Sequence, residues 1–143
     1  MIKDIRHTGI VVDDLEASLH FYSDLLGFQI VKQMEEAGDY IDNISSLRKV
    51  KVTTVKITSP SGQMIELLKY NSHPIEQKTR EISEIGISHI AFTVDNLDME
   101  YERLKGKEIQ FNSPPQLSPD GYAKVTFCRA PEGTLIELVE ILS

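Results

Sequence analysis

The sequence lacks several features that mark specialised classes of protein. Its 143 residues include one cysteine and no tryptophan, so an internal disulfide is excluded. No apolar run reaches the roughly 18 residues that a membrane span needs, and the N-terminal stretch has no signal-peptide core. We therefore expect a cytoplasmic protein without a membrane partner. The single thiol, Cys128, lies in an apolar stretch and is expected to be a small buried residue rather than a nucleophile.

Basic charge is also scarce. The chain has 15 basic and 22 acidic side chains and a formal net charge of -7. Since no segment gathers Lys and Arg, this acidic surface repels nucleic acid, and no nucleic-acid partner is expected. The hydrophobic content of 41% is ordinary for a globular protein, and the length suits one domain with a real core.

What the chain does contain is an internal repeat. The stretch that begins at His7 aligns with the one that begins at His89, and the stretch from Pro60 aligns with the one from Pro131. The first copy is longer between its two signatures, and we place the insertion at 38–47, a polar, turn-rich stretch expected to be a loop or lid. The identical pairs are His7/His89, Val12/Val94, Asp13/Asp95, Leu15/Leu97, Pro60/Pro131, Gly62/Gly133, Ile65/Ile136, Glu66/Glu137 and Leu67/Leu138.

The repeat predicts a single domain, 1–143, built of two modules. They cover about 1–70 and 86–143, and a linker over 71–85 with a short helix at 75–82 joins them. Each module reads as a strand, a helix and three further strands. The expected strands are 7–12, 28–35, 50–58 and 63–70 in the first module, and 87–94, 108–111, 122–130 and 134–141 in the second.

Turn and helix-capping residues occur at matching positions in both modules. Asp13 and Asp95 stand three residues before an acidic residue, which resembles the spacing of a capping box at a helix start. Gly27 and Gly106 are expected to end the two helices as left-handed caps. The stretches 59–62 and 130–133 contain proline and glycine and are expected to close matching hairpins.

Two glutamates lie inside apolar strands. By strand alternation, Glu66 and Glu137 each share a face with apolar residues two positions away. A carboxylate removed from water without a partner loses several kcal/mol, so buried carboxylates are normally paired or bound to metal. A solvated outward face is the alternative, because Glu140 on the same strand as Glu137 is expected to be an exposed acid.

Two histidines open equivalent strands. A lone histidine at a strand start is usually a core or edge residue whose ring nitrogens are hydrogen-bonded. Here His7 and His89 occupy equivalent positions in the repeat, as the two glutamates do. A pseudo-twofold relation between the modules would bring all four to one cleft. Two imidazoles and two carboxylates suit a divalent ion such as Zn, Ni, Co, Mn or Fe(II). His20 and His73 have no repeat partners and are expected to be solvated.

These motifs resemble the vicinal oxygen chelate superfamily, which includes glyoxalase I, methylmalonyl-CoA epimerase, extradiol dioxygenases and the fosfomycin and bleomycin resistance proteins. The resemblance covers nearly the whole chain. It implies an α+β fold in which two tandem βαβββ modules form a cupped, mixed, mostly antiparallel sheet with a metal site in the concave cleft. It also implies a homodimer, since a second copy would cover exposed sheet edges. Its motifs are HTGIVVDD, LEASLHFYSDLLGF, PSGQMIELL, ISHIAFTVDNL and PEGTLIELVE.

The order His, Glu, His, Glu is similar to that of glyoxalase I. The resemblance therefore implies a divalent-metal-dependent lyase or isomerase for a small oxygen-chelating substrate, such as a 2-oxoaldehyde thiol adduct. In this scheme Glu137 abstracts a proton next to a carbonyl, and the metal stabilises the enediolate that forms. Glu66 is a metal ligand that can share the role of base. The substrate stays open, because Val11 stands where an arginine for the substrate carboxylate would resemble glyoxalase I.

Three alternatives belong to the same resemblance. An epimerase that racemises an acyl-CoA would lead us to expect an amide in place of Glu66. An extradiol dioxygenase would have two histidines and one glutamate on Fe(II), which Glu66 argues against. A non-catalytic antibiotic-binding protein generally lacks the metal ligands. Fold alone does not decide among these activities.

Overall fold

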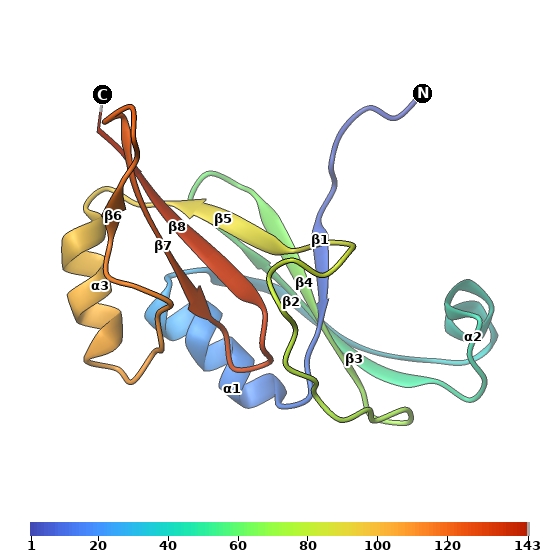
Figure 1. The fold of residues 1–143 in the computed structure, drawn as a ribbon. Helices are drawn as coiled ribbons and strands as arrows, with labels where there is room; N and C mark the ends of the chain where they lie inside the picture. The colour runs from blue at the N-terminus through green and yellow to red at the C-terminus, as the bar shows by residue number, and fades with distance from the viewer. Residues whose placement is uncertain (143) are drawn as a thin grey trace. The chain divides into compact units, whose positions relative to one another are not determined.

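Two four-stranded mixed sheets make up the computed structural model, which describes residues 1–142 (Figure 1). One sheet, with strand order β1-β4-β3-β2, belongs to a first unit, Met1–Gln77, and the other, with order β5-β8-β7-β6, belongs to a second unit, Lys78–Ser143. Helices are few and short. The predicted α+β class with mixed sheets is thus confirmed, while the domain boundaries drawn from the repeat stay a prediction.

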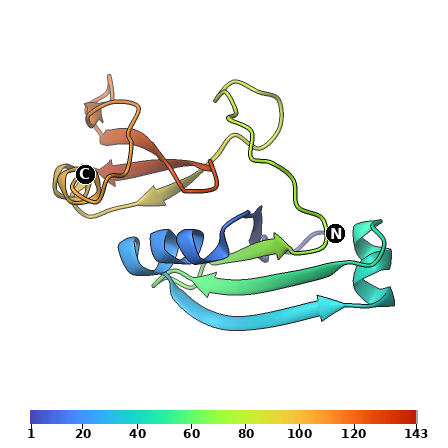
Figure 2. The ribbon, with the colours of Figure 1, turned by 90° about the horizontal axis from the view of Figure 1, so that it is seen from below.

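The first unit follows the order strand, helix, three strands, with one further helix inserted. β1 runs parallel to β4, and the β2–β3 and β3–β4 pairs are antiparallel. Figure 2 shows α1 lying along the first sheet and α2 at one end of it. The elements are β1 (Thr8–Val11), α1 (Leu15–Leu19), its π-helical continuation η1 (His20–Leu25), β2 (Gln29–Ala37), α2 (Asp39–Ser45), β3 (Lys51–Thr58) and β4 (Met64–Tyr70).

Strand alternation divides the first sheet into two different faces. Val55, Ile57 and Leu67 point to one side and are fully buried, as are the aromatic rings of Phe21 and Tyr22 from η1, which contact each other edge to face. Burying each such side chain stabilises the fold by about 1.5–3 kcal/mol. Glu66, next to Leu67 on β4, consequently points to the opposite face of the sheet.

The second unit repeats the same order without the inserted helix. β5 runs parallel to β8, and β7 pairs antiparallel with both β8 and β6. Its buried face carries Leu138, Ile136 and Cys128, and α3 contributes the buried Leu97 and Leu104. The elements are β5 (His89–Thr93), α3 (Leu97–Lys105), β6 (Gln116–Leu117), β7 (Ala123–Arg129) and β8 (Leu135–Ile141).

The helix starts lie one residue later than the capping pattern predicts. The cap of α1 is Asp14, whose carboxylate accepts a hydrogen bond from the Ala17 backbone N–H. The cap of α3 is Asn96, which accepts from the Met99 N–H in the same way. Each helix therefore begins with a side chain that satisfies an otherwise unpaired backbone donor, but Asp13 and Asp95 are not those side chains.

The two glycines that follow the helices differ. Gly27 has a φ of 85°, as predicted for a left-handed cap. Gly106 has a φ of -65°, so the prediction of a left-handed cap at this residue is wrong. In the second unit the left-handed conformation falls on Glu108, with a φ of 66°. The two hairpin turns are confirmed, because Gly62 and Gly133 both have positive φ and donate to the carbonyls that open their turns.

Three predicted segments need correction. The insertion at 38–47 contains helix α2 rather than a loop, and the Asp42 carboxylate ties it to the residues just before β3 by accepting from the Lys49 and Val50 N–H groups. The stretch 75–82 has no helix. No strand forms at 108–111, where the N–H groups of Glu108 and Ile109 still close the end of α3; the edge strand is β6 instead. Within residues 1–142, no helix is long and apolar enough to cross a membrane.

Candidate metal centre

The second unit brings its predicted histidine and glutamate into contact. His89 begins β5, and Glu137 lies in the middle of β8, where its register partner is Ala91. The offset of two residues between His89 and Ala91 keeps the imidazole on the same face as the carboxylate. The Nε2 atom of His89 lies 3.0 Å from Oε2 of Glu137, and the two side chains are 35% and 22% exposed.

The first unit repeats this register. The partner of Glu66 is Gly9, and His7 precedes Gly9 by two residues, as His89 precedes Ala91. His7 therefore stands at the equivalent backbone position. Its Nδ1 atom is buried and has no hydrogen-bond partner among residues 1–142. A buried polar atom left unpaired costs about 1–3 kcal/mol, so this nitrogen lacks the partner that such atoms normally have.

The residue across from each glutamate differs between the units. Phe127 of β7 is the register partner of Glu137, and its ring contacts the His89 imidazole edge to face at a centroid distance of 5.1 Å. Lys56 of β3 is the register partner of Glu66 and is half-buried. In the described part of the chain, no hydrogen bond or ion pair engages the Lys56 ammonium. One glutamate thus has an aromatic residue across from it in the sheet, and the other has a lysine.

Helix α2 packs on the Glu66 face of the first sheet. Ile41 is buried against Val50 and Val52, and the half-buried Leu68 and Tyr70 join this cluster. Leu68 and Tyr70 follow Glu66 at two-residue intervals, so they share its face. Helix α2, which replaces the predicted loop, therefore packs on the same face of the sheet that carries the proposed ligand Glu66. Three apolar side chains of this segment remain exposed: Tyr40, Ile44 and Leu47.

Several other predicted residues can now be placed. Cys128 is fully buried, and burial raises the pKa of its thiol to about 12, which confirms a packing role. His20 is exposed and pairs with Asp24 at 2.8 Å. The prediction that Glu140 is an exposed acid is wrong, because its side chain is half-buried and hydrogen-bonded. Its carboxylate is directed to the start of α3, where it accepts a 2.8 Å hydrogen bond from the Leu97 N–H, an interaction that the helix dipole favours.

One residue of the candidate site escaped the sequence reasoning. The Oγ atom of Ser88 lies 3.1 Å from Nδ1 of His89. The repeat gave no signal for it, because the residue before His7 is Arg6. A search for a hydroxyl next to each candidate ligand would have found it, since ligating histidines usually have a partner for their second ring nitrogen.

The donor set fits a divalent ion. Imidazole nitrogen and carboxylate oxygen bind such ions at about 2.0–2.2 Å, so two ligands at right angles lie about 3.0 Å apart. The Nε2 to Oε2 distance of 3.0 Å in the second unit matches this spacing. Among residues 1–142, no three or more His, Cys, Asp or Glu side chains come together in a group that could hold a metal ion. Each unit supplies one His and one Glu.

Comparison with known proteins agrees with this fold. The chain is 30% identical to the uncharacterized protein YwkD of Bacillus subtilis, over 98% of both chains. It is 26% identical to the lactoylglutathione lyase of Schizosaccharomyces pombe, over 94% of this chain and 46% of that enzyme. A solved glyoxalase family protein from Bacillus cereus shares the fold with a TM-score of 0.89 and 20% identity, over 100% of this chain and 97% of that one.

A family model provides the wider assignment. The model for the Glyoxalase/Bleomycin resistance protein/Dioxygenase superfamily matches residues 4–138. This range contains strands β1 to β7, the start of β8 and the residues His7, Glu66, His89 and Glu137. The chain therefore belongs to the Glyoxalase/Bleomycin resistance protein/Dioxygenase superfamily.

Proposed function

We propose that this protein is a divalent-metal-dependent lyase or isomerase of the glyoxalase type. His7, Glu66, His89 and Glu137 are its metal ligands in this proposal, and its substrate is a small molecule with neighbouring oxygens next to a removable proton. Members of this superfamily generally use a divalent metal, and the weak similarity to a lactoylglutathione lyase points in the same direction. The cytoplasmic location and the homodimer stay predictions.

One observation carries the proposal. The same two-residue offset aligns a histidine with a glutamate in both units, and in the second unit this offset produces a 3.0 Å contact. The repeated register places a histidine and a glutamate on one face in each unit, which is the arrangement that two pairs of metal ligands would need. The buried and unpaired Nδ1 of His7 also supports a ligand role, because coordination would supply the partner that this side chain lacks.

Glu137 is the proposed base. A bound divalent ion supplies Lewis acidity to the substrate's chelating oxygens. The Glu137 carboxylate would remove the proton from the carbon next to the carbonyl and return it to the neighbouring carbon, while the substrate's hydroxyl hydrogen passes to the other chelating oxygen, so the protein ends in its starting protonation state. Phe127 is the cross-strand neighbour of Glu137 and packs its ring against His89, so one side of the proposed site is apolar.

Metal titration is the first test. Chelator-stripped protein is titrated by calorimetry with Ni, Co, Zn, Mn and anaerobic Fe(II), in the wild type and in His89→Ala. We expect one ion per chain, with affinity strongly reduced in the variant. The matched control is His20→Ala, since His20 is an exposed histidine outside the pairs. Equal affinity in wild type and His89→Ala would contradict the site.

Proton exchange tests the reaction class. Metal-loaded protein is incubated in D2O with 2-oxoaldehyde thiol adducts and, separately, with acyl-CoA thioesters, and deuterium entry next to the carbonyl is followed by NMR. We expect turnover or exchange with one of these classes and its loss in Glu137→Gln. Metal binding without exchange in either class, combined with ring cleavage of a catechol, would instead favour the dioxygenase alternative.

A further inference from the structure

A row of charged side chains crosses the first sheet. Glu66 of β4 is the register partner of Lys56 on β3, and Lys56 is in turn the partner of Lys32 on β2. Partners on antiparallel strands carry their side chains on the same face of a sheet, with Cβ atoms about 4.5–5.5 Å apart. Both lysines therefore lie on the face that carries Glu66. We call Lys32 and Lys56 the lysine pair.

The lysine pair is unfavourable for the sheet itself. Like charges directly opposite each other destabilise two paired strands. A lysine on an edge strand discourages pairing with other chains, which accounts for the exposed Lys32 on β2, but Lys56 is half-buried on the inner strand β3. No hydrogen bond or ion pair within residues 1–142 engages either ammonium. The fold therefore holds two neighbouring cations that its own contacts do not neutralise.

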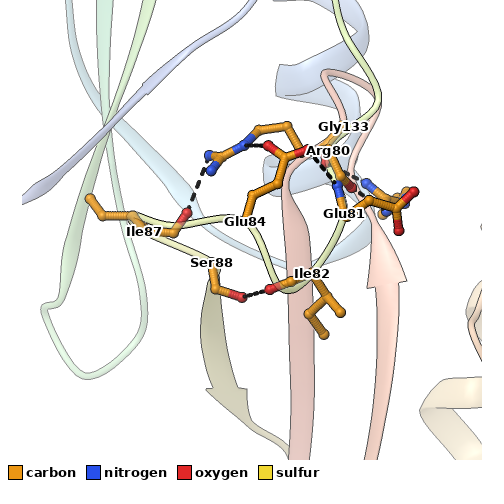
Figure 3. A network of polar contacts seen from close by, with 8 residues as sticks. Arg80, Glu81, Ile82, Glu84, Ile87, Ser88 and Gly133 are labelled. Carbon is orange, nitrogen blue, oxygen red and sulfur yellow. Dashed lines mark hydrogen bonds and ion pairs between the residues drawn. The ribbon is translucent and has the colours of Figure 1, made fainter.

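Several other cations of the chain have partners. Arg80 donates from Nε to the Glu84 carboxylate at 3.1 Å and from a terminal nitrogen to the Ile87 carbonyl at 3.3 Å, as Figure 3 shows. Lys124, a half-buried lysine of β7, pairs with the Asp98 carboxylate. The chain has 22 acidic side chains against 15 basic ones, so a shortage of carboxylates does not explain the unpaired lysines.

The charge balance of the row favours an added anion. Glu66 is the one carboxylate in line with the lysine pair, and in the proposed function it is a ligand of a divalent ion, which brings further positive charge. Glu36, the one acid that β2 carries on this face, lies four residues from Lys32, about 13 Å along the strand. Two ammonium groups beside a cation match a group with about two negative charges, such as a phosphate, better than a single carboxylate.

We propose that Lys32 and Lys56 bind a phosphate or phosphonate group of the substrate whose chelating oxygens bind the metal. The inference rests on the proposed function and adds a substrate class to it. Neighbouring strands lie about 4.8 Å apart, so the lysine pair extends one to two strand spacings from Glu66. A phosphate held there fits a short substrate, in which few bonds separate the phosphate from the chelating oxygens.

Inorganic phosphate tests the lysine pair without metal. Nitrogen-15-labelled, metal-free protein is titrated with phosphate at constant ionic strength and followed by NMR. We expect saturable shifts of the backbone amides around Lys32 and Lys56, and a Kd raised about 10-fold in Lys32→Met and in Lys56→Met, since each variant removes one charge-assisted contact. The matched control is Lys69→Met, because Lys69 is a half-buried lysine of β4 on the opposite face, across from Thr53.

Three results of this titration would overturn the proposal. They are the absence of saturable shifts at the lysine pair, an equal loss of affinity in Lys69→Met, and binding of acetate as tight as that of phosphate. Urea denaturation checks that the variants are folded. Removal of one of two facing cations should raise the denaturation midpoint or leave it unchanged.

A matched pair of chelators tests whether the bound phosphate and the metal belong to one ligand. Glycolohydroxamate chelates a divalent ion through neighbouring oxygens, and phosphoglycolohydroxamate adds a phosphate to it. With metal-loaded protein, we expect calorimetry to show at least about 10-fold tighter binding of the phosphorylated compound. The double variant Lys32→Met/Lys56→Met should abolish this advantage, and its persistence would overturn the proposal. If the wild type binds no ion, the proposed function fails, whereas the phosphate titration still decides for or against the lysine pair.

Discussion

The two units share a backbone arrangement and differ in the side chains around it. In both, a parallel strand pair aligns a histidine two residues before the register partner of a glutamate. The first unit places Lys56 across from its glutamate, and the second places Phe127 there. The two units therefore share the register positions of the proposed ligands and differ in the residues across from them. We propose separate tasks for the two glutamates on this basis. Glu66, which has a lysine across from it, is a metal ligand, and Glu137, which has an aromatic ring across from it, is the base.

The largest expected effect separates the two glutamates. Glu137→Gln should lower kcat by about 10²–10⁴-fold, the usual contribution of a general base, when metal is saturating. Glu66→Gln should weaken metal binding and lower kcat much less once metal is saturating. Steady-state kinetics at several metal concentrations measures both. A larger kcat loss in Glu66→Gln than in Glu137→Gln would reverse the assignment.

The second effect concerns the histidines, whose positions the register makes equivalent. His7→Ala and His89→Ala should each lower metal affinity by more than about 100-fold, because even outer-shell partners contribute 10–100-fold. We expect the two losses to agree within about threefold, since each variant removes one nitrogen from one His–Glu pair. Calorimetric titration of both variants checks this. A strong loss in only one of them would show that the units do not contribute equally.

A smaller effect is expected from Lys56. Its half-buried, unpaired ammonium on the Glu66 face should favour ligands with extra negative charge. Lys56→Met should weaken binding of phosphonoformate to the metal-loaded protein about 10-fold, which corresponds to about 1.4 kcal/mol. Maltol, a chelator with less charge, should bind equally to both proteins.

The control for this comparison is Lys107→Met, because Lys107 is an exposed lysine of the second unit. It should leave the affinity for both chelators unchanged. If Lys107→Met weakens phosphonoformate binding as much as Lys56→Met does, the effect reflects net charge and not the face that carries Glu66.

Sequence reasoning recovered the parts of the structure that repeat. The equivalent strand positions of Glu66 and Glu137, each within its own unit, and the hairpin glycines Gly62 and Gly133 follow from matched motifs and strand alternation. Helix α2 was missed because its seven residues depend on Asp42 bonding to a strand start farther along the chain. Ser88 was missed for a similar reason, since its contacts involve the Ile82 carbonyl, in a stretch before β5 that has no copy in the first unit.

The same lesson explains the strand that was expected at 108–111. That stretch has suitable residues, but the N–H groups of Lys107, Glu108 and Ile109 bond to carbonyls at the end of α3. Helix termination therefore consumes the donors of residues that a strand would need. The local sequence pattern could not reveal this competition. Gly106 has the residue type of a helix end, but the hydrogen bonds to the end of α3 continue through Ile109.

The last expected effect is on stability alone and tests the difference between Gly27 and Gly106 directly. Gly27 has a φ of 85° and no atom within 4 Å of an added Cβ, so Gly27→Ala should lower the free energy of unfolding by about 1–2 kcal/mol through backbone strain alone. Gly106 already has the helical φ of -65°, and an added Cβ would lie 3.4 Å from the Glu102 and Arg103 carbonyls. Gly106→Ala should therefore change stability by less than about 0.5 kcal/mol. Urea denaturation of both variants measures the contrast, and an equal loss in the two would mean that the glycines act alike, as the sequence alone suggests.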